Sequence, residues 1–265
     1  MRILFFSHYY PPENNAPAVR TAAHCRIWAA LGHDVTVITC APNHPTGEIF
    51  PGYRNRLLHR ETVDDVSIVR VFTLLAPNAG TVRRIVNYLS YMVSAVLASV
   101  LVRRPDIIIA TTPQFFCGWA GVFARFIHRR PLVLEVRDLW PESIVAVGAI
   151  TNRRIISILE RLERWMYRAA SRIVTVGRGY RDQLILRGVP KDKIEVIYNG
   201  ADPELVDAGP AESSAPSLPA HISFVCTYVG TVGMAHGLEI VLDAASLLAA
   251  EGRTEIGFMI VGDGA

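Results

Sequence analysis

The chain has 265 residues, of which 51% are hydrophobic and 19% are charged, and its formal net charge is +3. This length allows one large domain or two smaller ones around a sizeable core. The weak, dispersed positive charge argues against nucleic acid as a partner, whereas it suits contact with phosphate groups or with an anionic membrane surface.

Strand and helix signals alternate along residues 2–197, as is typical of a doubly wound, Rossmann-like α/β domain with a parallel sheet. Runs of β-formers predict strands at residues 2–7, 34–39, 66–72, 106–110, 132–136, 172–176 and 194–197. Helix formers predict helices at residues 17–31, 114–128, 152–169 and 178–187. The first strand begins almost at Met1, so we expect no signal peptide.

The loop after the first strand contains no glycine, so it lacks the GxGxxG pattern that brings a dinucleotide close to the backbone. A nicotinamide or flavin cofactor is therefore not expected. The loop offers hydrogen-bonding side chains instead, namely His8, Tyr9, Asn14 and Asn15. The alternative is a proline-stiffened turn in which His8 has a structural role.

Residues 85–102 carry no charge and are flanked by Arg83-Arg84 and Arg103-Arg104. The stretch is at the short limit for a membrane span, and its asparagine and three serines argue against one. We expect, in this order, a buried crossover helix, a helix on a membrane surface with its arginines on lipid phosphates, and a span.

The run Glu135-Val136-Arg137-Asp138-Leu139-Trp140-Pro141-Glu142-Ser143 places five polar side chains and a tryptophan where an apolar strand ends. In open α/β sheets ligands bind beyond the carboxyl ends of the strands, so this run predicts a site. The structural alternative is an Arg137–Asp138 ion pair with Trp140 covering the core. Similar but weaker polar loops follow other strands at residues 42–47, 111–114 and 175–179.

The four cysteines, Cys25, Cys40, Cys117 and Cys226, lie far apart in apolar segments, without CxxC spacing or a nearby His/Cys cluster. We therefore expect reduced core residues, a cytoplasmic protein and no metal site.

The composition predicts a first domain at residues 1–205, a linker at 206–220 that is rich in Pro, Ala and Ser, and a second domain from 221 to 265. The second domain has a strand at 222–229, a helix at 237–250 and a strand at 256–261. Its first turn is glycine-rich and offers Gly230, Thr231, Gly233 and His236 to a phosphate or sugar. One β-α-β unit cannot cover both faces of its own sheet, so we expect this domain to be truncated.

Four motifs together resemble the family 4 retaining glycosyltransferases. They are Tyr9-Tyr10-Pro11-Pro12-Glu13, Arg137-Asp138-Leu139-Trp140-Pro141-Glu142-Ser143, Asn199-Gly200-Ala201-Asp202 and Gly262-Asp263-Gly264. The DLWPES sequence is similar to that of transferases that add aminosugars to polyprenyl-linked intermediates of bacterial surface polysaccharides such as O-antigen. The resemblance implies a GT-B architecture, with the acceptor in the first Rossmann-like domain and the nucleotide-sugar in the second.

The resemblance also implies roles for individual residues. Asp138 would orient or deprotonate the acceptor hydroxyl, and Arg137 stands where relatives often have a histidine close to the transferred sugar. The substrate-binding set is expected to comprise His8, Tyr9, Tyr10, Asn14, Asn15, Trp140 and Glu142, and the donor-binding set Gly230, Thr231, Gly233 and His236. Thr231 and His236 depart from the family, because many relatives have arginine and lysine there.

The resemblance implies that the full-length protein transfers a sugar, expected to be an N-acetylated aminosugar, from a nucleotide-sugar to a polyprenyl-diphosphate-linked acceptor with retention. It would act at the cytoplasmic face of the membrane as a peripheral protein, without metal or other cofactor. The glutamate pair that relatives use for the donor is absent before Ala265, so we expect this chain to be inactive. Two alternatives remain: a nucleotide-sugar epimerase of similar architecture, and a non-catalytic module that binds the acceptor, a lipid phosphate or another subunit.

Overall fold

The computed structural model describes residues 1–75, 81–112, 114–142, 145, 150–200, 219–233 and 236–262. The chain divides into two compact units, Met1–Asn199 and Gly200–Ala265, each with its own sheet. The predicted boundary at residue 205 and nearly all of the predicted linker at 206–220 lie outside the described residues.

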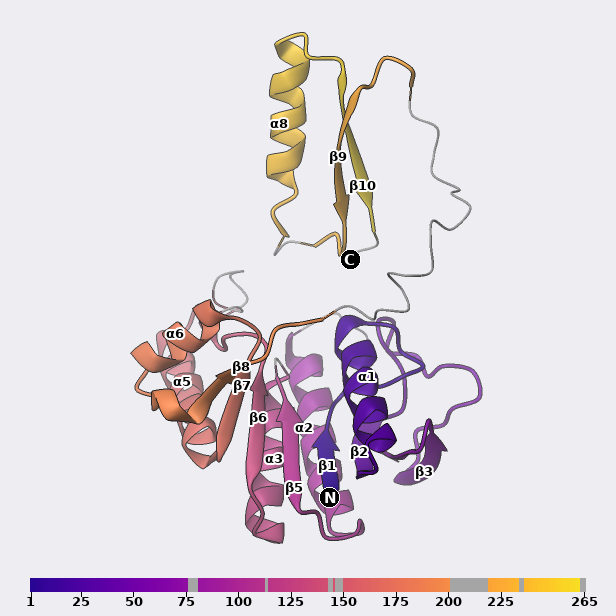
Figure 1. The fold of residues 1–265 in the computed structure, drawn as a ribbon, viewed down its shortest axis with the longest axis vertical. Helices are drawn as coiled ribbons and strands as arrows, with labels where there is room; N and C mark the ends of the chain where they lie inside the picture. Colours follow the sequence, from indigo (N-terminus) through magenta and orange to yellow (C-terminus); the bar gives the residue numbers. More distant parts are fainter. Residues whose placement is uncertain are drawn as a thin grey trace. The chain divides into compact units, whose positions relative to one another are not determined.

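The first unit is built on an eight-stranded sheet of order β3-β4-β2-β1-β5-β6-β7-β8 (Figure 1). Its strands are β1 (Arg2–Phe6), β2 (Asp34–Cys40), β3 (Leu58–Val63), β4 (Val66–Val71), β5 (Ile107–Thr111), β6 (Leu132–Val136), β7 (Arg172–Thr175) and β8 (Ile194–Val196). All neighbours pair in parallel except β3 and β4. The predicted parallel α/β sheet is confirmed.

The antiparallel edge strand β3 is missing from the sequence prediction, because four of its six residues are polar. It pairs with β4 through a turn in which Asp64 and Asp65 have φ of 51° and 59°. Such left-handed pairs form the tight turns that match the twist of a β-hairpin. Local turn chemistry therefore adds a strand that hydrophobicity does not reveal.

The helices of this unit are α1 (Ala16–Ala30), α2 (Thr81–Ser99), α3 (Phe115–His128), α5 (Arg153–Ala169) and α6 (Arg178–Leu186), with a short 3-10 turn, η1 (Lys191–Lys193). Side chains of α1 share one core cluster with Ile3 and Phe5 of β1. Side chains of α2, α3, α5 and α6 share another with Leu4 and Phe6. Because alternate residues of a strand point to opposite faces, the sheet is covered on both sides, with α1 on one and the other helices opposite.

Helix α2 is the crossover between β4 and β5, as expected first for residues 85–102, although it begins four residues earlier. It buries Asn87, Tyr91, Ala95 and Ala98 against the sheet. Its opposite face is exposed and apolar. No helix in the described part of the chain is long and apolar enough to cross a membrane.

The second unit has the predicted β-α-β order, with β9 (Phe224–Val229), α8 (Glu239–Ala250) and β10 (Ile256–Val261). The two strands pair in parallel. Across residues 219–233 and 236–262, none reaches the buried class, and Val229 and Ile240 are each 74% exposed. The described part of this unit therefore forms no core of its own.

Candidate functional site

The carboxyl ends of the parallel strands of the first unit meet along one edge of the sheet. The loops that begin there carry His8 after β1, Asn43 after β2, Thr112 after β5 and Arg137 after β6. Strands β1 and β6 are separated only by β5, so their loops start about 10 Å apart. The fold thus brings together the two loops that carry most of the predicted site.

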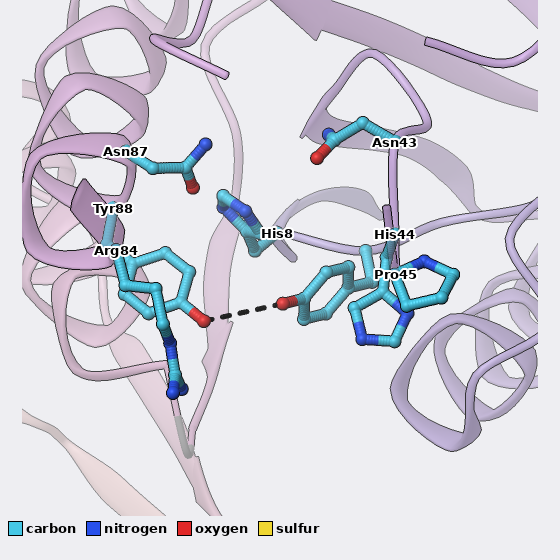
Figure 2. Close-up of a pocket in the computed structure, with 8 residues that line it drawn as sticks. His8, Asn43, His44, Pro45, Arg84, Asn87 and Tyr88 are labelled. Atoms are coloured by element: carbon cyan, nitrogen blue, oxygen red, sulfur yellow. Dashed lines mark hydrogen bonds between the residues drawn. The ribbon is translucent and has the colours of Figure 1, made fainter. Parts of the chain in front are cut away.

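A pocket opens at this edge between the loop after β1, the loop after β2 and helix α2 (Figure 2). Its lining residues are His8, Tyr9, Asn43, His44, Pro45, Arg84, Asn87 and Tyr88. The hydroxyl oxygens of Tyr9 and Tyr88 lie 3.5 Å apart across it. Of the lining, His8 and Tyr9 belong to the predicted site. Asp138 does not line this pocket.

His8 is buried beside α2 and contacts the rings of Tyr9, Tyr88 and Tyr91 edge-on, with centroids 4.8–5.1 Å apart. Burial, and next the nearby His44, lower the pKa of His8 from 6.5 to about 3. The imidazole is therefore neutral at physiological pH and is a weak base. By distance and angle, Nδ1 of His8 has no hydrogen-bond partner among the described residues, although the side-chain amide of Asn87 interacts with the ring and opposes the lowering of its pKa. A ligand polar group can still pair with Nδ1.

Glu13 organises the pocket, a role that the sequence does not reveal. Its Oε1 accepts hydrogen bonds from the backbone N–H groups of Asn43 and His44, both at 2.9 Å. The carboxyl group is buried, and burial raises its pKa. The sequence offers one signal of this role, which is a single acid in an otherwise uncharged loop. The partners of Glu13 lie 30 residues or more away along the chain, so the sequence does not identify them.

Of the other predicted residues of this loop, two have structural roles and one is exposed. Tyr10 is only 3% exposed and packs in the core cluster with α1, so the prediction that it contacts substrate is not supported. Asn15 caps α1, because its Oδ1 accepts from the backbone N–H of Ala18 at 3.0 Å. Asn14 is exposed.

Asp138 lies half-buried in the loop after β6, and its Oδ1 accepts from the backbone N–H of Leu139 at 2.9 Å. Among the described residues, Arg137 pairs with Glu135 at 3.3 Å and not with Asp138, so the alternative of an Arg137–Asp138 ion pair is wrong. Arg137 Nη1 also donates to Oδ1 of Asn199, at 2.7 Å.

The other two predicted site residues of the DLWPES motif, Trp140 and Glu142, make internal contacts. Trp140 stacks on Phe115, with ring centroids 5.0 Å apart, and covers the core as the structural alternative expected. Glu142 forms an ion pair with Arg187, with N and O 2.5 Å apart. The pairing joins the loop after β6 to the end of α6.

In the second unit, the predicted donor-binding turn is compact. The backbone N–H of His236 donates to the carbonyl of Gly233 at 2.9 Å, and the Tyr228 hydroxyl donates to the carbonyl of Thr231 at 2.8 Å. The end of β10 approaches the turn so closely that a Cβ at Gly262 would overlap the carbonyl of Gly230.

Within the described ranges, no group of three or more His, Cys, Asp or Glu side chains is arranged to hold a metal ion. Three of the four cysteines are buried, as predicted, whereas Cys226 is exposed.

The fold is the Rossmann-like architecture of GT-B glycosyltransferases. Anabaena Alr3699/HepE, solved in complex with UDP and glucose, superposes with a TM-score of 0.60 at 17% identity, over 100% of this chain and 62% of that one. A UDP-N-acetylglucosamine 2-epimerase superposes with a TM-score of 0.51 at 13% identity, over 97% of this chain and 62% of that one. At these identities the likeness shows the fold alone.

The chain belongs to the glycosyl transferase 4-like domain family, whose sequence model matches residues 15–200. It is 25% identical to the putative colanic acid biosynthesis glycosyl transferase WcaI of Escherichia coli (strain K12), over 100% of this chain and 66% of that protein. It is 28% identical to the probable glycosyltransferase WbjE of Pseudomonas aeruginosa, over 62% of this chain and 41% of that protein. The chain thus spans under two thirds of each relative.

Proposed function

We propose that the protein carrying this chain is a retaining glycosyltransferase of bacterial surface polysaccharide assembly. It transfers a sugar, for which an N-acetylated aminosugar is our candidate, from a nucleotide-sugar to a polyprenyl-diphosphate-linked acceptor. The first unit holds the acceptor, and the second holds the donor through Gly230, Thr231, Gly233 and His236. The observation that carries the proposal is the meeting of the His8 and Asp138 loops at one edge of the sheet, in a chain of this family.

In this proposal Asp138 orients or deprotonates the acceptor hydroxyl, and His8, as a neutral imidazole, forms a hydrogen bond to the substrate. The exposed cation Arg84 at the pocket contacts an anionic group. A leaving diphosphate develops negative charge, which basic groups and backbone N–H donors stabilise.

Replacing Asp138 with Asn tests the catalytic assignment. Asn keeps an oxygen that can accept from Leu139 N–H, so the loop retains its geometry while the carboxylate charge is lost. In the whole protein that carries this chain, we expect kcat to fall at least about a hundredfold, within the range typical of general acid–base catalysis. The assay follows labelled sugar into the lipid phase, with exposed Asp182→Asn on α6 as control. Parental turnover in Asp138→Asn would remove Asp138 from the mechanism.

The epimerase alternative is less well supported, because the matched family and both relatives carry transferase descriptions, whereas the likeness to an epimerase is one of fold. An epimerase acts on the free nucleotide-sugar and needs no membrane surface. Release of a C2-epimerised nucleotide-sugar, without sugar in the lipid phase, would favour it.

We further propose that the protein is peripheral at the cytoplasmic face of the membrane and docks through α2. Along its outer face, Ile85, Leu89, Val93 and Leu97 are exposed at successive four-residue steps, by 42–65%. Adjacent α3 adds the exposed side chains of Phe123, Phe126 and Ile127. The arginines Arg83, Arg84, Arg103 and Arg104 flank the stripe and are exposed. Apolar side chains between cations suit an anionic lipid interface.

Vesicle sedimentation tests this docking. The parent chain should pellet in larger part with phosphatidylglycerol vesicles than with phosphatidylcholine vesicles, because the arginines add electrostatic attraction. Leu97→Glu should lower the partition coefficient by about tenfold or more, since it removes apolar burial and adds a negative charge. Leu186→Glu on α6, at a side chain that is 79% exposed, is the matched control. Equal pelleting of Leu97→Glu and parent would contradict the docking face.

We also propose that residues 1–265 alone have no transferase activity. The reason lies in the second unit, whose described residues bury no side chain and so give the donor-binding turn no rigid support.

A further inference from the structure

A second group of charged residues gathers on the opposite side of the sheet from α2. Arg20 and His24 lie one helical turn apart on α1, and Glu135 and Arg137 lie two residues apart at the end of β6. Glu135 Oε1 is 3.3 Å from Nη2 of Arg137 and 3.7 Å from Nδ1 of His24. This cluster joins α1 to the loop of the predicted site, and no role proposed above uses Arg20 or Glu135.

Arg20 is incompletely satisfied in this cluster. Its Nε and Nη2 are buried and have no hydrogen-bond partner in the described parts of the chain. These two N–H groups form one edge of the planar guanidinium, the fork that binds two oxygens of a carboxylate or phosphate. Nε of Arg137, a side chain only 6% exposed, is also buried without a partner. Buried donors left unpaired are unfavourable, so an occupant that accepts from them is expected.

The net charge of the cluster favours an anion. Two guanidinium groups stand against the single carboxylate of Glu135, whose Oε1 pairs with Arg137 and whose Oε2 has no hydrogen-bond partner among the described residues. Burial, and next repulsion by Arg137, lower the pKa of Arg20 to about 10. Burial also lowers the pKa of His24, so this imidazole is uncharged at neutral pH and adds no charge to the cluster. The surplus is therefore one positive charge that no protein group offsets within the cluster.

We propose that Arg20 and Arg137 form a subsite for a diphosphate group. Donors from two separate guanidiniums suit the tetrahedral oxygens of phosphate better than a single planar carboxylate. A diphosphate occurs in both substrates of the proposed function, on which this inference rests for the identity of its source. Because the subsite lies wholly within the first unit, the acceptor's lipid diphosphate is the source we assign.

Calorimetric titration of the 265-residue chain with inorganic pyrophosphate tests the subsite. Arg20→Gln should weaken the Kd at least tenfold. Arg172→Gln removes the same charge from an exposed arginine at the amino end of β7, on the sheet edge opposite the subsite, and it should leave the Kd within twofold. The Arg20→Gln chain without ligand should unfold at the same urea concentration as the parent or a higher one, since the replaced group is unpaired. If Arg20 had a purely structural role, its replacement would instead lower that midpoint.

Farnesyl diphosphate and UDP distinguish the sources. Weaker binding of farnesyl diphosphate alone in Arg20→Gln supports the acceptor, and weaker binding of UDP alone reassigns the subsite to the donor. Pyrophosphate binding that is equal in Arg20→Gln and parent, or absent from the parent at millimolar concentration, overturns the proposal. Arg20-dependent pyrophosphate binding in a protein that transfers no sugar would preserve the subsite and reject the function.

Discussion

His8 shows how burial changes the chemistry of one residue. In the loop after β1 it has the appearance of a general base, yet it is buried among three aromatic rings, and burial lowers its pKa to about 3. It therefore contributes a neutral hydrogen-bonding group rather than a proton acceptor. A base at this edge must come from elsewhere, and Asp138 is the candidate.

The lowered pKa of His8 predicts how stability depends on pH. The folded chain disfavours protonated His8. The free energy of unfolding that neutral His8 contributes is therefore fully present above the ordinary pKa of 6.5 and is lost as the pH falls from 6.5 toward 3. Between pH 7 and pH 5 this residue should account for about 2 kcal/mol of lost unfolding free energy. Urea titrations of parent and His8→Asn at both pH values check it.

His24, His44 and His128 also have pKa values lowered chiefly by burial, so part of the slope will remain in His8→Asn. The prediction concerns the difference between the two proteins. An identical loss of stability in both would contradict it.

At the scale of the element, α3 is fixed against the sheet by glycine. A Cβ on Gly121 would lie 2.6 Å from Cβ of Ala110 on β5 and 3.0 Å from a methyl group of Leu132 on β6. The Leu132 methyl group can rotate away, but the Ala110 Cβ is fixed to the backbone and cannot move without shifting β5. The glycine thus permits a close approach of helix and sheet that a larger residue would prevent.

Gly121→Ala should therefore lower the free energy of unfolding by about 1–3 kcal/mol, despite the better helix propensity of alanine. Gly179→Ala in α6 is the matched control, because a Cβ there meets nothing within 4 Å. It should stabilise the chain by about 0.5–1 kcal/mol. Chemical denaturation of both variants gives the comparison, and a stabilised Gly121→Ala would show that α3 can move outward.

At the scale of the whole molecule, the buried residues lie in the first unit. All members of the two core clusters fall within residues 3–194, whereas no described residue of the second unit is buried. Because buried apolar area is the main source of stability, the two units should differ strongly in resistance to opening.

Hydrogen exchange of the intact chain tests this difference. Amides of β1, β5 and β6 should be protected by a factor that approaches the global unfolding equilibrium, and those of β9 and β10 should exchange at least about a hundredfold faster. Mass spectrometry of peptic fragments resolves the two regions. Equal protection of both sheets would mean that the second unit has a core outside the described residues.

Much of the fold was predictable because its signals are local. The alternation of apolar strands with helix formers predicted seven strands of the main sheet to within about a residue, and hydrophobic periodicity is read within one segment. Strand β3 was not predicted, because most of its residues are polar and it is a strand through its pairing with β4. The loops of the candidate site were likewise visible, since each follows a predicted strand.

The sequence by itself therefore determined the α/β class, the β-α-β order of the second unit and the family motifs. Only the tertiary structure decided which side chains meet: Arg137 with Glu135 and Asn199, Glu142 with Arg187, and Glu13 with the loop after β2. Most of these partners lie 30 or more residues apart along the chain, so no local pattern encodes their pairing. Strand order brings them to one edge, and burial then decides which of them remains free for a ligand.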